Sequence, residues 1–165
     1  RMFVSSSFTN VSIYANQFPT LDLQHTPSTA SLTFLDVSIN NYLTSLDTSY
    51  CVSMSTLVCH QNYALGDRLV VSGSALTFLF CGDSSITNLI LSGSPNLTTV
   101  WAQENSLTVN SINQLYIDLD NFGLSSGNLI LCGSLMASPT GLGVTARNNL
   151  VGKSWTIQDE SGVYP

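Results

Sequence analysis

The residues of this chain that could perform chemistry are two histidines, four cysteines and a scatter of serines and aspartates. A histidine held between a serine and an aspartate can turn the serine hydroxyl into a nucleophile. His25 and His60 fall in separate parts of the sequence, and we expect neither a G-x-S-x-G nucleophile elbow nor the H-E-x-x-H motif of a metalloprotease. We therefore expect a protein that is not an enzyme.

The cysteines allow two interpretations. Cys59 and Cys81 occupy equivalent positions in neighbouring segments, so they could form a disulfide or serve as small apolar side chains of a core. We expect the second role, because Cys is among the most buried residue types. No C-x-x-C motif marks a zinc site, and we expect Asp22 and Asp47 to be solvated surface residues rather than calcium ligands. The sequence therefore predicts neither a metal nor another cofactor.

The composition excludes several classes of partner. Four Lys or Arg residues against ten Asp or Glu residues give a net charge of −6, too little positive charge to bind nucleic acid or an anionic membrane surface. Apolar residues make up 44% of the chain, which predicts a folded protein, yet no apolar run approaches the ~20 residues of a membrane span. The opening RMFVSSSFTN resembles neither a signal peptide nor a natural initiating end, so we expect a processed product or a fragment of a longer chain.

A repeat of 21 to 24 residues organises most of the chain. Five copies of an L-x-x-L-x-(small apolar) unit start at residues 8, 32, 54, 76 and 97. Eight positions after each start lies one column of polar residues: Asn16, Asn40, Asn62, Ser84 and Asn105. An Asn amide can satisfy backbone groups where a chain turns inside a stack, so the repeat predicts coils that stack on one another.

This pattern resembles the leucine-rich repeats, L-x-x-L-x-L-x-x-N/C-x-L, over roughly residues 8 to 107. The second half of each repeat, such as Leu43-Thr-Ser-Leu46-Asp, resembles the irregular bacterial and viral type, in which L-x-x-L-D-L-S follows. The resemblance implies a mainly β leucine-rich repeat solenoid with two parallel sheets over residues 1–107. The third repeat departs from the pattern, because one extra residue precedes Leu69 and leaves the register of its second strand open.

The remaining residues, 108–165, predict a small α/β segment of the same domain that caps the solenoid. The spacing of Ile112, Leu115, Leu119 and Phe122 indicates a helix, with Asn110 or Ser111 as its cap and Gly123 at its end. GNLILCG and SWTIQ indicate strands, and a second helix after Thr140 is expected to face inward through three apolar residues, Leu142, Ala146 and Leu150. The ending GLGVTARNNLVGKSWTI resembles the terminal segment of leucine-rich repeat proteins from bacterial surfaces and phage particles.

Alternation along the first strand of each repeat separates an inward column from an outward face. Aromatic residues on that outward face need an explanation, because the face should meet water. We expect a binding site formed by an aromatic stripe and two polar partners: Phe34, Val58, His60, Phe78, Phe80, Trp101 and Gln103. Within this stripe Phe80 and Trp101 are predicted to be neighbours in one column. Aromatic surfaces suit both apolar protein partners and sugar rings, and Trp is frequent at binding hot spots.

Two functions share this face, and both stay open. The resemblance implies a non-catalytic adhesion or receptor-binding module that recognises a protein or a glycan. The alternative is a structural virion or fibre component, in which the same face contacts other subunits or a second copy of the chain. Both place the protein outside the cell, on a virion or a bacterial cell surface, without nucleic-acid binding or membrane insertion.

Overall fold

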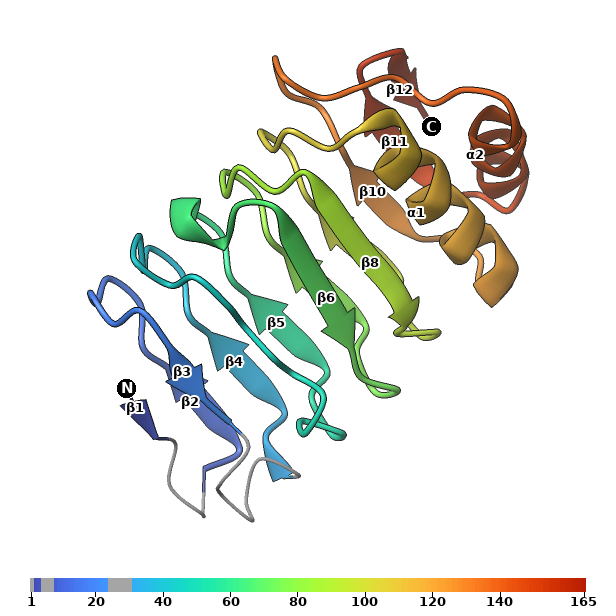
Figure 1. The fold of residues 1–165 in the computed structure, drawn as a ribbon. Helices are drawn as coiled ribbons and strands as arrows, with labels where there is room; N and C mark the ends of the chain where they lie inside the picture. The colour runs from blue at the N-terminus through green and yellow to red at the C-terminus, as the bar shows by residue number, and fades with distance from the viewer. Residues whose placement is uncertain (1, 4–7, 24–30) are drawn as a thin grey trace.

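The computed structural model of the chain describes residues 2–3, 8–23 and 31–165. These residues form a mainly parallel β-solenoid with two helices near the C-terminus, and successive coils stack along the molecule (Figure 1). Each coil crosses a first sheet, turns, and returns through a second layer. The solenoid with parallel sheets therefore agrees with the architecture expected from the repeat.

The first sheet runs through every coil. In the described part of the chain it has eight strands, ordered β12-β11-β10-β9-β7-β5-β4-β2, and only β11 and β12 pair antiparallel. Its strands are β2 (Asn10–Ser12), β4 (Phe34–Asp36), β5 (Thr56–Val58), β7 (Phe78–Phe80), β9 (Thr99–Trp101), β10 (Asn128–Ile130), β11 (Thr156–Asp159) and β12 (Gly162–Tyr164). Because equivalent residues pair from strand to strand, their side chains form columns that alternate between the interior and the outer face.

The central inward column holds the sheet against the core. Its members in register are Val11, Leu35, Leu57, Leu79, Val100, Leu129 and Ile157. From Leu35 to Ile157 each of these side chains is 0% exposed, whereas Val11 in the first coil is only half-buried. The inward side chains of such short strands can be fully buried only when another strand of the sheet lies on each side.

The predicted polar column forms a ladder of hydrogen bonds between coils. The Oδ1 atom of Asn40 accepts from the backbone N–H of Asn16 at 2.9 Å, and the Oδ1 atom of Asn62 accepts from the N–H of Asn40 at 3.0 Å. Ser84 and Asn105 continue the same pattern through a hydroxyl and an amide oxygen. The Asn side chains also donate to backbone carbonyls of their own turn, so they pair groups that no strand can pair.

The residue before each ladder residue has left-handed backbone geometry. This residue has φ between 52° and 59° in all five turns: Ala15, Ile39, Gln61, Asp83 and Glu104. None of them is Gly, so each turn carries the steric cost that L-residues have in this region. The ladder bonds compensate for that cost, because they fix the turn in the same place in every coil.

The second layer is less regular than the expected second sheet. The strands β1 (Met2–Phe3) and β3 (Leu21–Asp22) pair at one end, and β6 (Arg68–Ser72) and β8 (Asn88–Gly93) pair further along. Between these pairs the described residues form a single bridge, from Thr20 to Ser45. The second layer is therefore parallel, as expected, but in the described residues it consists of separate short pairs, because the returning segment after Leu43 follows the stack without strand pairing to β6.

The extra residue of the third repeat is absorbed before its second strand. A short 3-10 helix, η2 (Tyr63–Leu65), is followed by Gly66, whose φ of 48° suits glycine. Leu69 then faces the core with 1% exposure and pairs in register with Leu89 of β8. The insertion therefore lengthens the turn and leaves the inward pattern of β6 intact.

Two helices close the C-terminal end of the second layer. The helix α1 (Val109–Phe122) lies beside β8 and continues its layer (Figure 1). Thr108 caps α1 by accepting from the N–H of Ser111, so the expected caps Asn110 and Ser111 are wrong, whereas Gly123 ends the helix with φ of 74° as expected. Thr108 serves as the cap because it is the last extended residue before the helical turn.

The second helix, α2 (Leu142–Gly152), faces inward differently from the prediction. Ala146 and Leu150 are buried as expected, but Leu142 is 74% exposed. The buried residue at the start of α2 is instead Gly143, which approaches Asn113 of α1 so closely that a Cβ atom there would clash. The close packing of the two helices thus requires a glycine at position 143, and the neighbouring Leu142 side chain faces solvent.

Candidate functional site

The residues for Ser-His-Asp chemistry are not assembled into a nucleophilic site in the described residues. Ser38 is 2% exposed, and its hydroxyl donates to Asp36 at 2.7 Å instead of to a histidine. The ring of His60, in the next coil, stacks on Phe80 with a centroid distance of 4.4 Å. His25 lies outside the described residues. The hydroxyl of Ser38 therefore bonds to the carboxylate of its own strand, and no hydrogen bond joins it to the ring of His60.

The sequence does contain one G-x-S-x-G pattern, so the expectation that none is present is wrong at the level of the motif. Residues 123–127 read G-L-S-S-G and match the G-x-S-x-G pattern of a nucleophile elbow. That elbow requires a strand followed by a turn and a helix, so that the serine lies at the top of a sheet. Here the segment connects α1 to β10, which is the opposite order, and Ser125 is exposed. The match lacks the structural context that the chemistry needs.

The four cysteines are free thiols. Cys59 and Cys81 lie in the core at 0% exposure, as the role of small apolar residues predicts. Burial raises the pKa of Cys81 to about 12, and burial followed by the nearby Cys81 raises the pKa of Cys59. Both thiols stay protonated at neutral pH, which agrees with a role as packed core side chains.

Neither a metal cluster nor a membrane helix is found in residues 2–3, 8–23 and 31–165. These residues contain no group of three or more His, Cys, Asp or Glu side chains placed to hold an ion. The helices among them are too short and too polar to cross a bilayer.

The predicted aromatic stripe does form a contact cluster on the outer face of the first sheet. Phe80 and Trp101 are register partners, and their rings meet edge to face at 5.7 Å. Phe78 approaches the same Trp101 edge to face at 5.2 Å, while His60 stacks on Phe80. We call these four residues, His60, Phe78, Phe80 and Trp101, the ring cluster. Each member is half-buried, because the rings cover one another.

The other predicted site residues border the ring cluster. Val58 is the register partner of Phe80 in the neighbouring coil. Gln103 lies over the backbone of Gly82, and its Oε1 atom is buried without a hydrogen-bond partner. Phe34 shares a column with Phe78 but is separated from it by the whole rung of Thr56. The structure thus brings Val58 and Gln103 to the edge of the cluster and leaves Phe34 apart.

Two residues of this face were missed because they belong to the C-terminal segment. The strand β10 continues the first sheet beyond β9, so Ile130 becomes the register partner of Trp101. Asn128 accepts a hydrogen bond from the indole Nε1 of Trp101 at 2.7 Å, which fixes the orientation of that ring. The sequence carried the signal in Leu129 and Leu131, whose alternation matches that of Val100 and Ala102 in the preceding coil.

The resulting patch is mainly aromatic, and no Asp, Glu, Lys or Arg side chain belongs to the ring cluster. The outward column that contains Phe80 and Trp101 becomes polar at both ends of the patch. Asp36 precedes Val58 in this column, and Gln158 follows Ile130. No helix or strand of the described chain packs on this face. Such a surface can stack on sugar rings or on apolar side chains, while the indole N–H of Trp101 is already bonded to Asn128.

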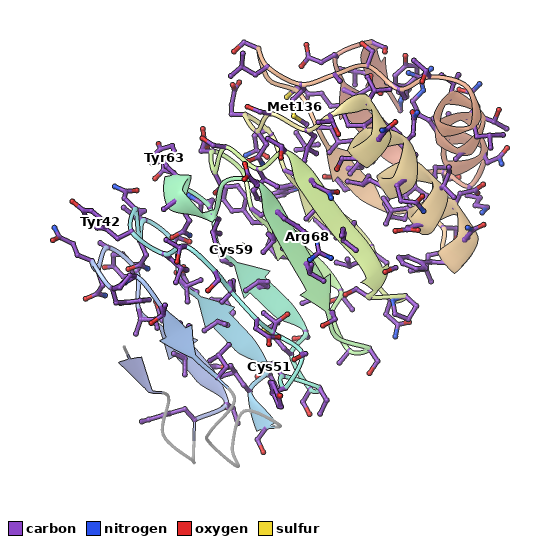
Figure 2. The ribbon with its side chains drawn as sticks, viewed as in Figure 1. Tyr42, Cys51, Cys59, Tyr63, Arg68 and Met136 are labelled. Atoms are coloured by element: carbon purple, nitrogen blue, oxygen red, sulfur yellow. The ribbon has the colours of Figure 1, made fainter. Side chains whose placement is uncertain are left out.

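Two shallow hollows lie elsewhere on the surface. One of about 480 Å³ follows the interruption in the second layer, between Ser45 and Val70, with Arg68 at its border. The other, of about 290 Å³, lies at the turn edge beside Asn41 and Tyr42. Figure 2 shows Tyr42 and Arg68 on these two separate parts of the surface. Neither hollow includes a residue of the ring cluster.

Comparisons of this chain with protein-family models, with curated proteins and with solved structures find no match.

Proposed function

We propose that the chain is a non-catalytic binding module of the leucine-rich repeat type, and that the ring cluster is its recognition surface for a protein or a glycan. The observation that carries the proposal is the contact between four rings on a sheet face that no other element covers. An aromatic cluster that serves only the fold would be expected inside the core, where it would bury more surface.

The assignment to the leucine-rich repeats rests on the sequence pattern and on the hydrogen-bonded column of Asn residues. The bonds from Asn40 and Asn62 to the turns of their own and adjacent coils give that pattern a physical role. Placement on a phage particle or a bacterial surface is part of the proposal and is supported by the resemblance of residues 141–157 to the terminal segments of such proteins.

The test is ligand binding by the wild-type chain and by Trp101→Ala. We expect the wild type to select a small set of ligands on a glycan array or in a screen of candidate receptor proteins, and Trp101→Ala to lose at least about tenfold in affinity, as a hot-spot aromatic does. Tyr63→Ala is the matched control, because Tyr63 is an aromatic residue that is 52% exposed at a turn outside the cluster. An unchanged profile for Trp101→Ala would remove the ring cluster from the site.

The alternative, a structural subunit that assembles through this face, has the same cluster in its favour. Mass photometry of the isolated chain separates the two functions. A stable monomer that binds a ligand supports the recognition module, whereas a dimer or fibre that dissociates in Trp101→Ala but not in Tyr63→Ala supports assembly.

A further inference from the structure

The N-terminal end of the solenoid contains half of an additional coil. The strand β1 pairs in parallel with β3, with Met2 opposite Leu21 and Phe3 opposite Asp22, so β1 occupies the second layer one coil ahead of β3. The first sheet, however, ends at β2 (Figure 1). In residues 2–3 and 8–23 the coil to which β1 belongs therefore has its second-layer strand in place and no strand beside β2.

The inner surface at this end is correspondingly open. Phe8 is 53% exposed, and Val11, Ile13 and Phe18 are half-buried. The equivalent residues of the next coil are all 0% exposed: Leu32, Leu35, Val37 and Leu43. The apolar pattern of the first coil thus matches that of a coil with first-sheet neighbours on both sides, although the described residues provide one on a single side.

At this end the last acceptor of the hydrogen-bond ladder has no donor among the described residues. Every later ladder residue accepts from the backbone N–H of the ladder residue one coil earlier. The Oδ1 atom of Asn16 receives no hydrogen bond from any described group, and its Nδ2 atom donates only to Ile13 and Tyr14 of its own coil. Asn16 therefore presents the same acceptor that elsewhere fixes the preceding coil.

We propose that the open edge of β2 is a docking surface for one further strand with the repeat's own pattern, parallel to β2 and covalently joined to β1. Its apolar side chains cover Val11 and Ile13, and the backbone N–H of its ladder residue donates to Oδ1 of Asn16. The covalent link follows from β1, because in the other coils the first-sheet strand leads directly into the second layer. The surface is distinct from the ring cluster, which lies on the outer face of later coils.

The register defines a graft that tests this surface. Leu21 pairs with Met2, and the bridge from Thr20 to Ser45 makes Leu46 the next residue of the same column. A copy of residues 31–44, fused directly before Arg1, therefore supplies one complete first half of a coil in register. The matched control is the same graft with the copies of Leu35 and Val37 changed to Ser, which removes the inward side chains but keeps length and charge.

We expect the intact graft to raise the Tm of the full chain by about 5 °C or more and to slow hydrogen exchange of the β2 amides at least about tenfold. The Ser-substituted graft should do neither. Asn16→Ala should lower the Tm of the grafted chain by several degrees more than it lowers that of the parent chain, because only the graft gives Asn16 a donor.

Equal Tm values for the two grafts would overturn the proposal. So would protection of β2 by the free 14-residue peptide, at the concentration of the protein, to the same extent as by the fused graft, since the link to β1 should supply most of the effective concentration. Protection of β2 in a dimer of the unmodified chain would assign the edge to a second copy and would also overturn it.

Discussion

The two ends of the solenoid are closed in different ways. At the C-terminal end β10 and β11 extend the first sheet, and Trp155 is buried at 0% exposure with its Nε1 donating to the carbonyl of Leu124. At the N-terminal end the edge strand β2 has no outer neighbour among the described residues, and the inner side chain of Val11 is half-buried. The same inward column is thus fully covered at one end and partly open at the other.

This difference shows that the burial and the hydrogen bonding of each coil depend on its neighbours in the stack. A coil inside a solenoid shares apolar contacts and ladder bonds with two neighbours, whereas a terminal coil shares them with one. The C-terminal segment replaces the missing neighbour with a different structure, in which the hydroxyl of Tyr116 donates to Asp159 at 2.6 Å and Arg147 lies over the ring of Tyr164. Burial, and after it the bond to Asp159, raises the pKa of Tyr116, so this buried donor stays protonated.

The largest difference in stability loss between the two ends should follow the removal of apolar side chains. Trp155→Ala is expected to lower the free energy of unfolding by about 4 kcal/mol, because it opens a large cavity in the cap. Gly127 lies directly against that indole ring and could not fill the space. Val11→Ala, at the open end, should cost about 1 kcal/mol, since part of the Val11 side chain already meets water. Urea unfolding of both variants measures the two values, and equal losses would contradict the comparison.

Substitutions in the polar ladder should likewise cost more stability in a buried coil than at the N-terminal end. Asn62 is buried, accepts from the N–H of Asn40 and donates to the carbonyl of Cys59 at 2.7 Å. Asn62→Ala leaves these backbone groups unpaired inside the stack, and we expect a loss of about 3 kcal/mol. Asn16→Ala removes the equivalent side chain where it is exposed and should cost less than about 1 kcal/mol.

Thermal and urea unfolding of the two Asn variants give this comparison directly. A second middle-coil variant, Asn62→Ser, serves as the control, because Ser84 already performs the ladder role with a hydroxyl. We expect Asn62→Ser to lose less than Asn62→Ala. If Asn16→Ala were as damaging as Asn62→Ala, the two ends would not differ in the way proposed.

A smaller and pH-dependent effect should be confined to the closed end. Lys153 pairs with Asp120, and Asn149 also donates to Asp120 at 2.8 Å, which joins α1 to α2. Burial acts to raise the pKa of Asp120, but the hydrogen bonds from Asn149 and Lys153 and the charge of Lys153 outweigh it and lower that pKa. A carboxylate with a lowered folded pKa contributes stability above its ordinary pKa near 4 and loses it as the pH falls through the folded value.

We therefore expect Asp120→Asn to cost about 1 kcal/mol at pH 7 and much less in acid. Urea unfolding from pH 7 down to pH 3 measures the difference, and Asp67→Asn, at an exposed position in a coil, is the control. Hydrogen exchange should show α2 loosening in acid before β5. A difference between Asp120→Asn and wild type that stays constant with pH would show that the pair does not titrate as described.

Much of the repeat region could be predicted from sequence, because its period imposes the same local geometry in every coil. The inward positions of Leu35, Leu57 and Leu79 and the ladder role of Asn40 and Asn62 follow from the pattern. The pairing of Phe80 with Trp101 also follows, since both lie at the same place in adjacent strands. Each of these features depends only on neighbours one period away.

The features that were not predicted depend on contacts between segments without a shared period. The exposure of Leu142 arises because Gly143 lets α2 approach Asn113 of α1, and a helical stripe in one sequence carries no information on such an approach. Asn128 and Ile130 joined the aromatic face because β10 extends the first sheet, which the change of pattern after Leu107 concealed. The interruption of the second layer had no sequence signal that we recognise.

The smallest predicted effect concerns the left-handed turn that recurs in all five repeats. Ile39 has φ of 59°, although β-branched residues rarely adopt left-handed geometry, and it is 39% exposed. Ile39→Asn should raise the free energy of unfolding by about 0.5 kcal/mol, because Asn tolerates this geometry and the relief exceeds the lost apolar contact. Gln61→Asn, in the next turn at φ of 55°, should gain less, since Gln is unbranched at Cβ. Urea unfolding measures both gains, and a loss for Ile39→Asn would mean that contacts of Ile39 at the turn edge outweigh the backbone strain.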